Sequence, residues 1–140
     1  MRTFQLHILA ADRVFFEGEC ESVVAPTASG QYGVQAHHSN MIAGIAPGQL
    51  TFRTAQGETR YAAVSAGMIK VEHNDVLILV DSAERPEDID VVRAQREADE
   101  AREAILQKNS IREYRSAQAA LARSINRLRV KQHTGSMMGK

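Results

Sequence analysis

The sequence has one cysteine and no long apolar run, and each shortage excludes a class of protein. Cys20 cannot form a disulfide within the chain, and its place in the apolar-polar alternation of CESVVA predicts a buried or half-buried strand position rather than a catalytic thiol. No apolar run approaches the roughly 20 residues that span a bilayer. The N-terminus lacks the apolar core and cleavage site of a signal peptide, so we expect a cytoplasmic chain.

Aromatic residues and catalytic motifs are also scarce. Aromatics make up 5% of the chain, and Tyr114 is the only one after residue 84, so the stacking platforms of nucleic-acid-binding proteins are missing. There is no serine elbow, phosphate loop, paired cysteine motif or dinucleotide fingerprint. The five histidines show no metal-ligand spacing. We therefore expect no catalytic residues, no metal and no nucleic acid; a hydrolase that uses His37 or His38 is a weaker alternative.

The composition is that of a soluble globular protein, with 140 residues, 44% hydrophobic and 24% charged. Its net charge of zero hides a division. Residues 1–84 carry five basic and nine acidic groups, a net of −4, whereas residues 85–140 carry twelve and eight, a net of +4. The basic excess is greatest between residues 111 and 133, which favours an anionic partner; a solvated basic face is the other interpretation.

Two periodicities divide the chain at the same place. Residues 3–82 read as short apolar runs separated by turn signals about every 8 to 12 residues, the spacing of an antiparallel sandwich or barrel. The run from Val76 to Val80 is apolar at every position, which predicts a central strand covered on both sides. Gly67, inside another apolar stretch, predicts a bulge or a close backbone approach.

From Ile89 onward the apolar residues recur every three or four positions, and no glycine follows residue 84 until Gly135. A short break at residues 108–110 separates two helices, which predicts an antiparallel hairpin with a frayed tail from about residue 134. The predicted fold is therefore α+β, with an antiparallel β-sandwich over residues 1–84 followed by a two-helix antiparallel hairpin over 85–140. The helical stripes are rich in alanine and bury little area, which indicates a hairpin that opens at modest cost; a small hairpin permanently docked on the sheet is the other interpretation.

The joint between the two halves, ERPEDIDVVRA from Glu84 to Ala94, has the proline and acidic residues of a helix start, with a cap predicted at Asp88. It also begins a candidate anion site. Asp90 and Arg93 are about one turn apart, and so are Arg123 and Arg127, so each pair lies on one side of its helix.

The three arginines offer forked donors to phosphate oxygens, and a carboxylate from Glu84 or Asp90 could accept from an amino group or hydroxyl of a ligand. A surface ion pair between Asp90 and Arg93 is the simpler interpretation.

Five segments follow one another along the chain: FQLHILAADRVFFEGE, VVAPTASGQYGV, HHSNMIAGIAPGQL, VSAGMIKVEHNDVLILVDSAE and EDIDVVRA. In this order and spacing they resemble the epsilon subunit of bacterial F-type ATP synthases over residues 1–133. The resemblance implies a β-sandwich and a helical hairpin, and a subunit that is not itself an enzyme.

The resemblance also implies partners. It implies a central-stalk subunit that couples rotation driven by protons or sodium ions to ATP synthesis, with the sandwich on the gamma subunit and the c-ring. The hairpin would extend to the alpha and beta subunits and inhibit ATP hydrolysis. The resemblance also implies a peripheral subunit at the cytoplasmic face of the bacterial plasma membrane, which contacts the membrane only through the c-ring.

Site residues follow from the same resemblance. No cofactor is required, and ATP is implied as a regulatory ligand in the folded hairpin. The implied ATP contacts are Glu84, Ile89, Asp90, Arg93, Ala94, Arg123 and Arg127; the implied beta-subunit contacts are Arg112, Arg115, Arg123 and Arg127. The implied c-ring contacts are Gln31 and His38, although Gln31 replaces an acidic residue of the family and the family's proline-glycine turn before His38 is absent. A stand-alone nucleotide-sensing module that acts on another partner is the alternative function.

Overall fold

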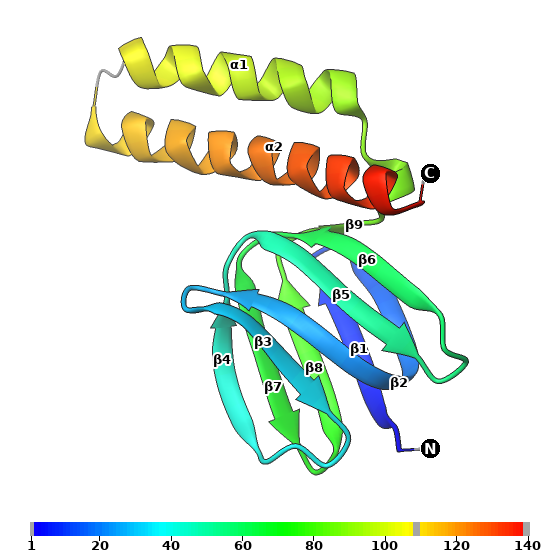
Figure 1. The fold of residues 1–140 in the computed structure, drawn as a ribbon. Coiled ribbons are helices and arrows are strands. Elements are labelled where there is room, and N and C mark those ends of the chain that lie inside the picture. The colour runs from blue at the N-terminus through cyan, green and yellow to red at the C-terminus, as the bar shows by residue number, and fades with distance from the viewer. Residues whose placement is uncertain (1, 108–109, 139–140) are drawn as a thin grey trace. The chain divides into compact units, whose positions relative to one another are not determined.

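A computed structural model describes residues 2–107 and 110–138 and separates the chain into two compact units, Met1–Arg85 and Pro86–Lys140 (Figure 1). The first unit is built of strands and the second of helices. The α+β fold expected from the sequence, a sandwich followed by a helical hairpin, is confirmed. Lys108 and Asn109 of the predicted break lie outside the described residues.

Strands of the first unit form one continuous sheet that folds into two layers. Their bounds are β1 Phe4–Ala10, β2 Arg13–Thr27, β3 Gly30–Gln35, β4 Met41–Ile45, β5 Gly48–Thr54, β6 Thr59–Val64, β7 Gly67–Glu72, β8 Asp75–Val80 and β9 Ala83–Glu84. The hydrogen-bonded order is β4-β7-β8-β1-β2-β5-β6-β9, with β3 on β2. Neighbouring strands are antiparallel except β1 and β8, which are parallel.

The long strand β2 belongs to both layers. Its first half pairs with β1, and its second half pairs with β3 and β5 after a register shift between Cys20 and Ser22. Figure 1 shows β2, β3 and β5 in front of β1, β7 and β8. Such a shift bends a strand and increases its twist, which lets the sheet fold over its own inner face.

The core lies between the two layers and uses every second residue of the strands. Its largest fully buried side chains are Leu6, Ile8, Val23, Val34, Leu50, Phe52, Val64, Ile69, Val71, Val76 and Ile78. Cys20 is also fully buried, as predicted, and burial raises the pKa of its thiol to about 11. A thiol that stays protonated at neutral pH is a packing group and not a nucleophile.

Strand β8 corrects one prediction. It is central in its layer, between β1 and β7, as expected. Its burial nevertheless alternates: Ile78 is fully buried, while Leu79 is 37% exposed. The prediction that both faces are covered is wrong, because this layer packs on the core with one face only and the apolar run extends to the other face as well.

Gly67 confirms the predicted close backbone approach. A Cβ atom at this position would lie 1.9 Å from the carbonyl oxygen of Leu79 and 2.8 Å from the Cα of Val80. Gly67 begins β7 and pairs with Val80 at the end of β8. No side chain fits there, so the two strands can meet at this distance only around a glycine.

The second unit contains a short 3₁₀ helix, η1 Pro86–Asp88, and two α-helices, α1 Val91–Gln107 and α2 Ile111–Met138. The cap predicted at Asp88 is wrong, because Asp88 belongs to η1. Asp90 caps α1 instead: its Oδ1 accepts a hydrogen bond of 3.1 Å from the backbone N–H of Arg93. The proline starts the 3₁₀ turn, which moves the beginning of α1 two residues further along the chain.

Helix α2 also begins with a sequence-encoded cap. The Oγ of Ser110 accepts from the backbone N–H of Glu113 at 3.1 Å and donates to the Oε1 of Glu113 at 3.1 Å. This is the serine-x-x-glutamate pattern of a helix start. The helix continues through Met138, whereas the sequence predicts fraying from about residue 134. Thr134 is buried and its hydroxyl donates to the carbonyl of Val130, which ties this turn to the one before it.

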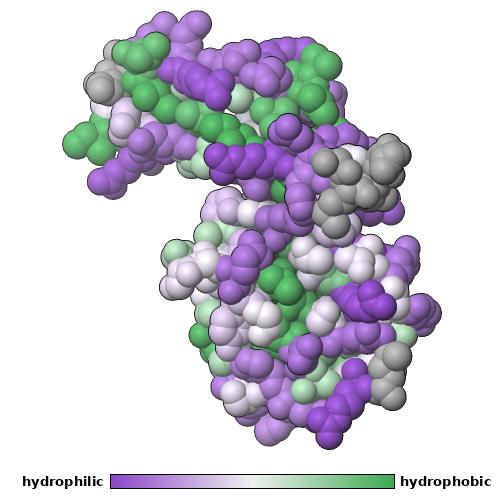
Figure 2. Space-filling model, in the orientation of Figure 1, coloured by the Kyte–Doolittle hydropathy of each residue, from purple (hydrophilic) through white to green (hydrophobic). Residues whose placement is uncertain are grey.

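Small side chains form the seam between α1 and α2. On α1 the buried residues are Ala94, Ala98 and Ala101. On α2 they include Ala117, Ser124 and Val130. Figure 2 shows a band of hydrophobic side chains along the visible face of the hairpin, flanked by hydrophilic ones. The seam matches the predicted alanine stripe, and each alanine contributes little buried apolar area.

Candidate functional site

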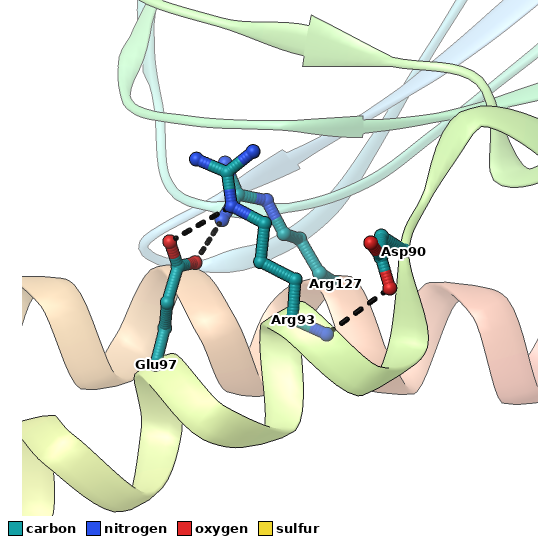
Figure 3. A network of polar contacts seen from close by, with 4 residues as sticks. All are labelled: Asp90, Arg93, Glu97 and Arg127. Carbon is teal, nitrogen blue, oxygen red and sulfur yellow. Dashed lines mark hydrogen bonds and ion pairs between the residues drawn. The ribbon is translucent and has the colours of Figure 1, made fainter.

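Glu97 lies between two arginines from different helices of the hairpin (Figure 3). Its Oε2 is 3.3 Å from the Nε of Arg93, one turn earlier on α1. Its Oε1 is 3.1 Å from the Nη1 of Arg127 on α2. Both carboxylate oxygens therefore have a guanidinium partner, and the second partner joins the two helices.

These three side chains differ in their exposure. The Arg93 side chain is 71% exposed, whereas those of Glu97 and Arg127 are 34% and 29% exposed. An ion pair on the open surface contributes little, because water and salt screen it. The pair of Glu97 with Arg127 is half-buried, so water and salt screen its charges less. Removing one partner should therefore destabilise the hairpin more than removing a partner of an exposed pair.

The simpler interpretation of the sequence is an ion pair between Asp90 and Arg93. In the structure, the Asp90 carboxylate instead contacts the backbone of Arg93 and not its guanidinium. Its Oδ1 is occupied by the backbone N–H of Arg93, as a helix cap (Figure 3). The carboxylate thus serves to hold the first turn of α1, and this turn positions the Arg93 side chain beside Glu97.

A groove of about 730 Å³ runs between α1 and α2. Three carboxylates and three guanidinium groups line it: Glu97, Glu100, Glu113, Arg112, Arg123 and Arg127. The structure therefore brings Arg123 and Arg127 together in one groove, one turn apart, as their spacing predicts. Guanidinium groups at this spacing can donate to the oxygens of one phosphate or of two linked phosphates.

The base of the hairpin has a further link near the groove. The Nζ of Lys131 on α2 donates to the carbonyl oxygen of Pro86 in η1 at 2.9 Å. Ile89 and Ala94, which the resemblance implies as ATP contacts, are buried at 5% and 1% exposure. Their side chains serve packing, which leaves polar contact with a ligand to the charged residues around them.

The remaining predicted residues lie in other places. Glu84 is on β9 of the first unit, where it pairs with Ala63 of β6. Arg112 and Arg115 are exposed on the first two turns of α2, so they are available to a partner. Gln31 is exposed on β3.

His38 follows β3 and is held by its neighbours. Its Nε2 is 3.0 Å from the Tyr32 hydroxyl, and its Nδ1 is 2.8 Å from the carbonyl oxygen of Ser39. A ring nitrogen beside a carbonyl must donate, so the other nitrogen accepts from Tyr32. His37, next to it, has a positive φ of 64°, and its backbone N–H donates to the Oδ1 of Asn74. These contacts fix the loop, and among the residues that the structure describes neither histidine ring is paired with a carboxylate.

Two further observations bear on the class of protein. Residues 2–107 and 110–138 contain no group of three or more histidine, cysteine or acidic side chains placed to hold a metal ion. Neither helix, over those same residues, combines the length and the hydropathy that a membrane span requires.

Comparison with known families decides the identity of the chain. The profile of the ATP synthase delta/epsilon chain β-sandwich domain matches residues 3–86, and that of the long α-helix domain of the same chain matches residues 87–132. The chain belongs to the ATP synthase delta/epsilon family. The resemblance found in the sequence is thereby confirmed, and membership makes the chain a non-catalytic subunit of an ATP synthase, as expected.

Curated members of the family match the chain over nearly its whole length. The ATP synthase epsilon chain of Ruminiclostridium cellulolyticum is 40% identical over 91% of this chain and 95% of its own length. The epsilon chain of Caldanaerobacter subterraneus is 36% identical over 92% and 94%. That of Shouchella clausii is 35% identical over 97% and 100%.

Two solved structures share the fold of this chain at lower sequence identity. A chain of the Euglena gracilis mitochondrial ATP synthase superposes with a TM-score of 0.76 at 22% identity, over 87% of this chain and 77% of that one. A chain of the Tetrahymena thermophila central stalk and c-ring assembly gives a TM-score of 0.65 at 14% identity, over 91% and 95%. The fold of this chain therefore recurs where most of the sequence differs.

Glu97 is the site residue that the sequence analysis missed. Its position four residues after Arg93 is a signal for an ion pair within α1. Nothing in the local pattern indicates Arg127 as its second partner, because that contact depends on the offset between two helices.

Proposed function

We propose that the chain is a central-stalk subunit of a proton- or sodium-translocating F-type ATP synthase. In this proposal the sandwich binds the gamma subunit and the c-ring and couples their rotation to catalysis. The hairpin extends to the alpha and beta subunits and inhibits ATP hydrolysis. The subunit sits on the cytoplasmic face of the bacterial plasma membrane, peripheral, and contacts the membrane only through the c-ring.

The observation that supports this division of labour is the independence of the two cores. The hydrophobic cluster of the sandwich is formed by residues between Phe4 and Ala83 only. The hairpin is held by an alanine seam, the contact of Arg127 with Glu97 and the link of Lys131 to Pro86. The first unit can therefore stay bound and folded while the second changes its conformation.

Exposed apolar side chains support a second position of the hairpin. Leu106 near the end of α1 is 83% exposed, Ile111 at the start of α2 is 72% exposed and Val92 is 70% exposed. In the compact hairpin these side chains stay in water, so they contribute little hydrophobic stabilisation. Contact with a protein partner would cover them, and the basic residues Arg112 and Arg115 beside Ile111 favour an acidic partner surface.

Removing residues 88–140 from the assembled synthase tests this proposal. We expect the truncated subunit to assemble normally, because the sandwich core is left intact, and the ATP hydrolysis rate of the complex to rise several-fold. Steady-state hydrolysis and the subunit composition of the purified complex measure the two effects. Loss of the subunit from the complex after truncation would contradict the assignment of rotor binding to the sandwich.

We propose further that ATP is a regulatory ligand of the compact hairpin, with no cofactor required. Arg123 and Arg127 line one groove, and Arg93 lies beside it, so three guanidinium groups can meet the phosphates. A ligand that binds the compact state and not the extended one shifts the equilibrium toward the compact state. ATP would thus withdraw the hairpin from the catalytic subunits. The carboxylate of Asp90 would then face the base or ribose.

Calorimetric titration of the intact chain with ATP tests the nucleotide site. We expect heat of binding, and a loss of affinity of roughly tenfold or more for Arg123→Ala, because one charge-assisted contact is removed. Arg129→Ala is the matched control, since Arg129 is an exposed arginine of the same helix that does not line the groove. Absence of heat at millimolar ATP would remove the nucleotide proposal. Binding of ATP without any association with gamma would favour a stand-alone nucleotide sensor.

A further inference from the structure

Glu97 occupies the position that a phosphate would need. Its two oxygens bind the Nε of Arg93 at 3.3 Å and the Nη1 of Arg127 at 3.1 Å. Figure 3 shows the carboxylate facing both guanidinium groups, which approach it from different helices. A phosphate that used the same nitrogens would have to take the place of this carboxylate, since both are anions that accept from the same donors.

The surroundings of Glu97 make this competition strong. Glu97 also lines the groove that holds Arg123 and Arg127, so it remains close to any anion bound there. The carboxylate is attached to α1, so it competes as an intramolecular ligand with a high effective concentration. It is half-buried, and the repulsion between its charge and a phosphate is therefore screened less than on the open surface.

The same contact replaces a ligand in holding the helices together. An anion bound between Arg93 and Arg127 would bridge α1 and α2, and Glu97 already makes that bridge from within the chain. Each alanine of the seam adds little apolar area, so the ion pair contributes to closing the hairpin, together with the link of Lys131 to Pro86.

We infer that Glu97 is a built-in competitor for the phosphate site, which contributes to the stability of the closed hairpin without ligand and lowers its affinity for ATP. The inference rests on the proposed nucleotide site and identifies the residue that determines its affinity. The hairpin would bind ATP only at high ATP concentrations, because each ATP molecule must displace Glu97 before it reaches Arg93 and Arg127.

Titration of the intact chain with ATP, for the unmodified protein, Glu97→Gln and Glu97→Ala, tests the inference. Glutamine keeps the size of the side chain and removes its charge. We expect both variants to bind ATP at least about tenfold more tightly, because the competitor is weakened or removed. Glu103→Gln is the matched control, since it removes the same charge about two turns further along α1 and should leave the affinity unchanged.

Hydrogen exchange of the α1 backbone without ATP provides the second measurement. We expect faster exchange in Glu97→Gln than in the unmodified chain or Glu103→Gln, and a return to slow exchange at saturating ATP. Unchanged exchange would overturn the role of Glu97 in closing the hairpin.

The titration separates the failure of this inference from that of the proposed site. Equal ATP affinity of the unmodified chain and both variants would overturn the competition and leave the nucleotide site standing. Weaker binding by the variants would overturn it too, because the loss of the bridge between the helices would then cost the ATP site more than the loss of the competitor gains. No binding by any of the chains would overturn the competition together with the nucleotide site.

Discussion

Replacing Gly67 with alanine is expected to destabilise the sandwich by about 3 kcal/mol or more, toward the upper end of the cost of overpacking. The added Cβ would lie 1.9 Å from the carbonyl oxygen of Leu79, which is backbone and cannot turn away as a side chain would. Strands β7 and β8 must then separate where they pair at Val80. For a domain of this size the loss corresponds to a fall in Tm of roughly 12 °C or more, measured by calorimetry.

Gly44→Ala is the control for this experiment. Gly44 lies on β4, and a Cβ at this position meets no atom within 4 Å. The same change of residue should leave the Tm unchanged or raise it slightly, because it removes backbone freedom from the unfolded chain without causing a clash. Equal effects of the two substitutions would contradict the close approach of β7 to β8.

Replacing Ala98 with glutamate is expected to open the hairpin. Ala98 is fully buried in the seam of α1 with α2, so the new carboxylate would have to be desolvated among small apolar side chains. An unpaired buried charge costs several kcal/mol, more than this thin seam can offset. We expect the α1 amides of the intact chain to exchange at least about a hundredfold faster, the ratio that corresponds to roughly 3 kcal/mol.

The assembled synthase gives a functional readout of the same substitution. If an open hairpin inhibits hydrolysis, a complex with Ala98→Glu should hydrolyse ATP more slowly than the unmodified one. Ala122→Glu is the control, because Ala122 is exposed on α2 and the same carboxylate there stays in water. Faster hydrolysis with Ala98→Glu would contradict the proposal that release of the hairpin is the inhibitory event.

The candidate site could be predicted from the sequence only in part. The spacing of Arg123 and Arg127 predicts one side of one helix, and the groove confirms it. The sequence pattern predicts the cap of α1 at Asp88, but the cap is Asp90. The 3₁₀ turn of η1 delays the start of α1, and the sequence pattern does not distinguish this turn from the first turn of the helix. The second partner of Glu97 could not be read from either helix alone.

The fold shows the same limit. Alternation and turn signals suffice for a sandwich, since burial of one sheet face demands a period of two. They do not reveal that β2 belongs to both layers or that β1 and β8 are parallel, because strand pairing joins residues far apart in the chain. The uniformly apolar run from Val76 to Val80 predicts a strand covered on both faces. This prediction is wrong, since the outward-facing residues of the strand remain partly exposed.

By itself, the sequence determined what depends on local period and composition: two units, a strand half and a helical half, an alanine seam, a basic second helix and the family. Each of these follows from the residue pattern within one element or from the composition of a longer segment. Tertiary structure alone decided which charges meet. The pairing of Glu97 with both Arg93 and Arg127 requires α1 and α2 to lie at one particular offset, and that offset is set by the packing of their small side chains.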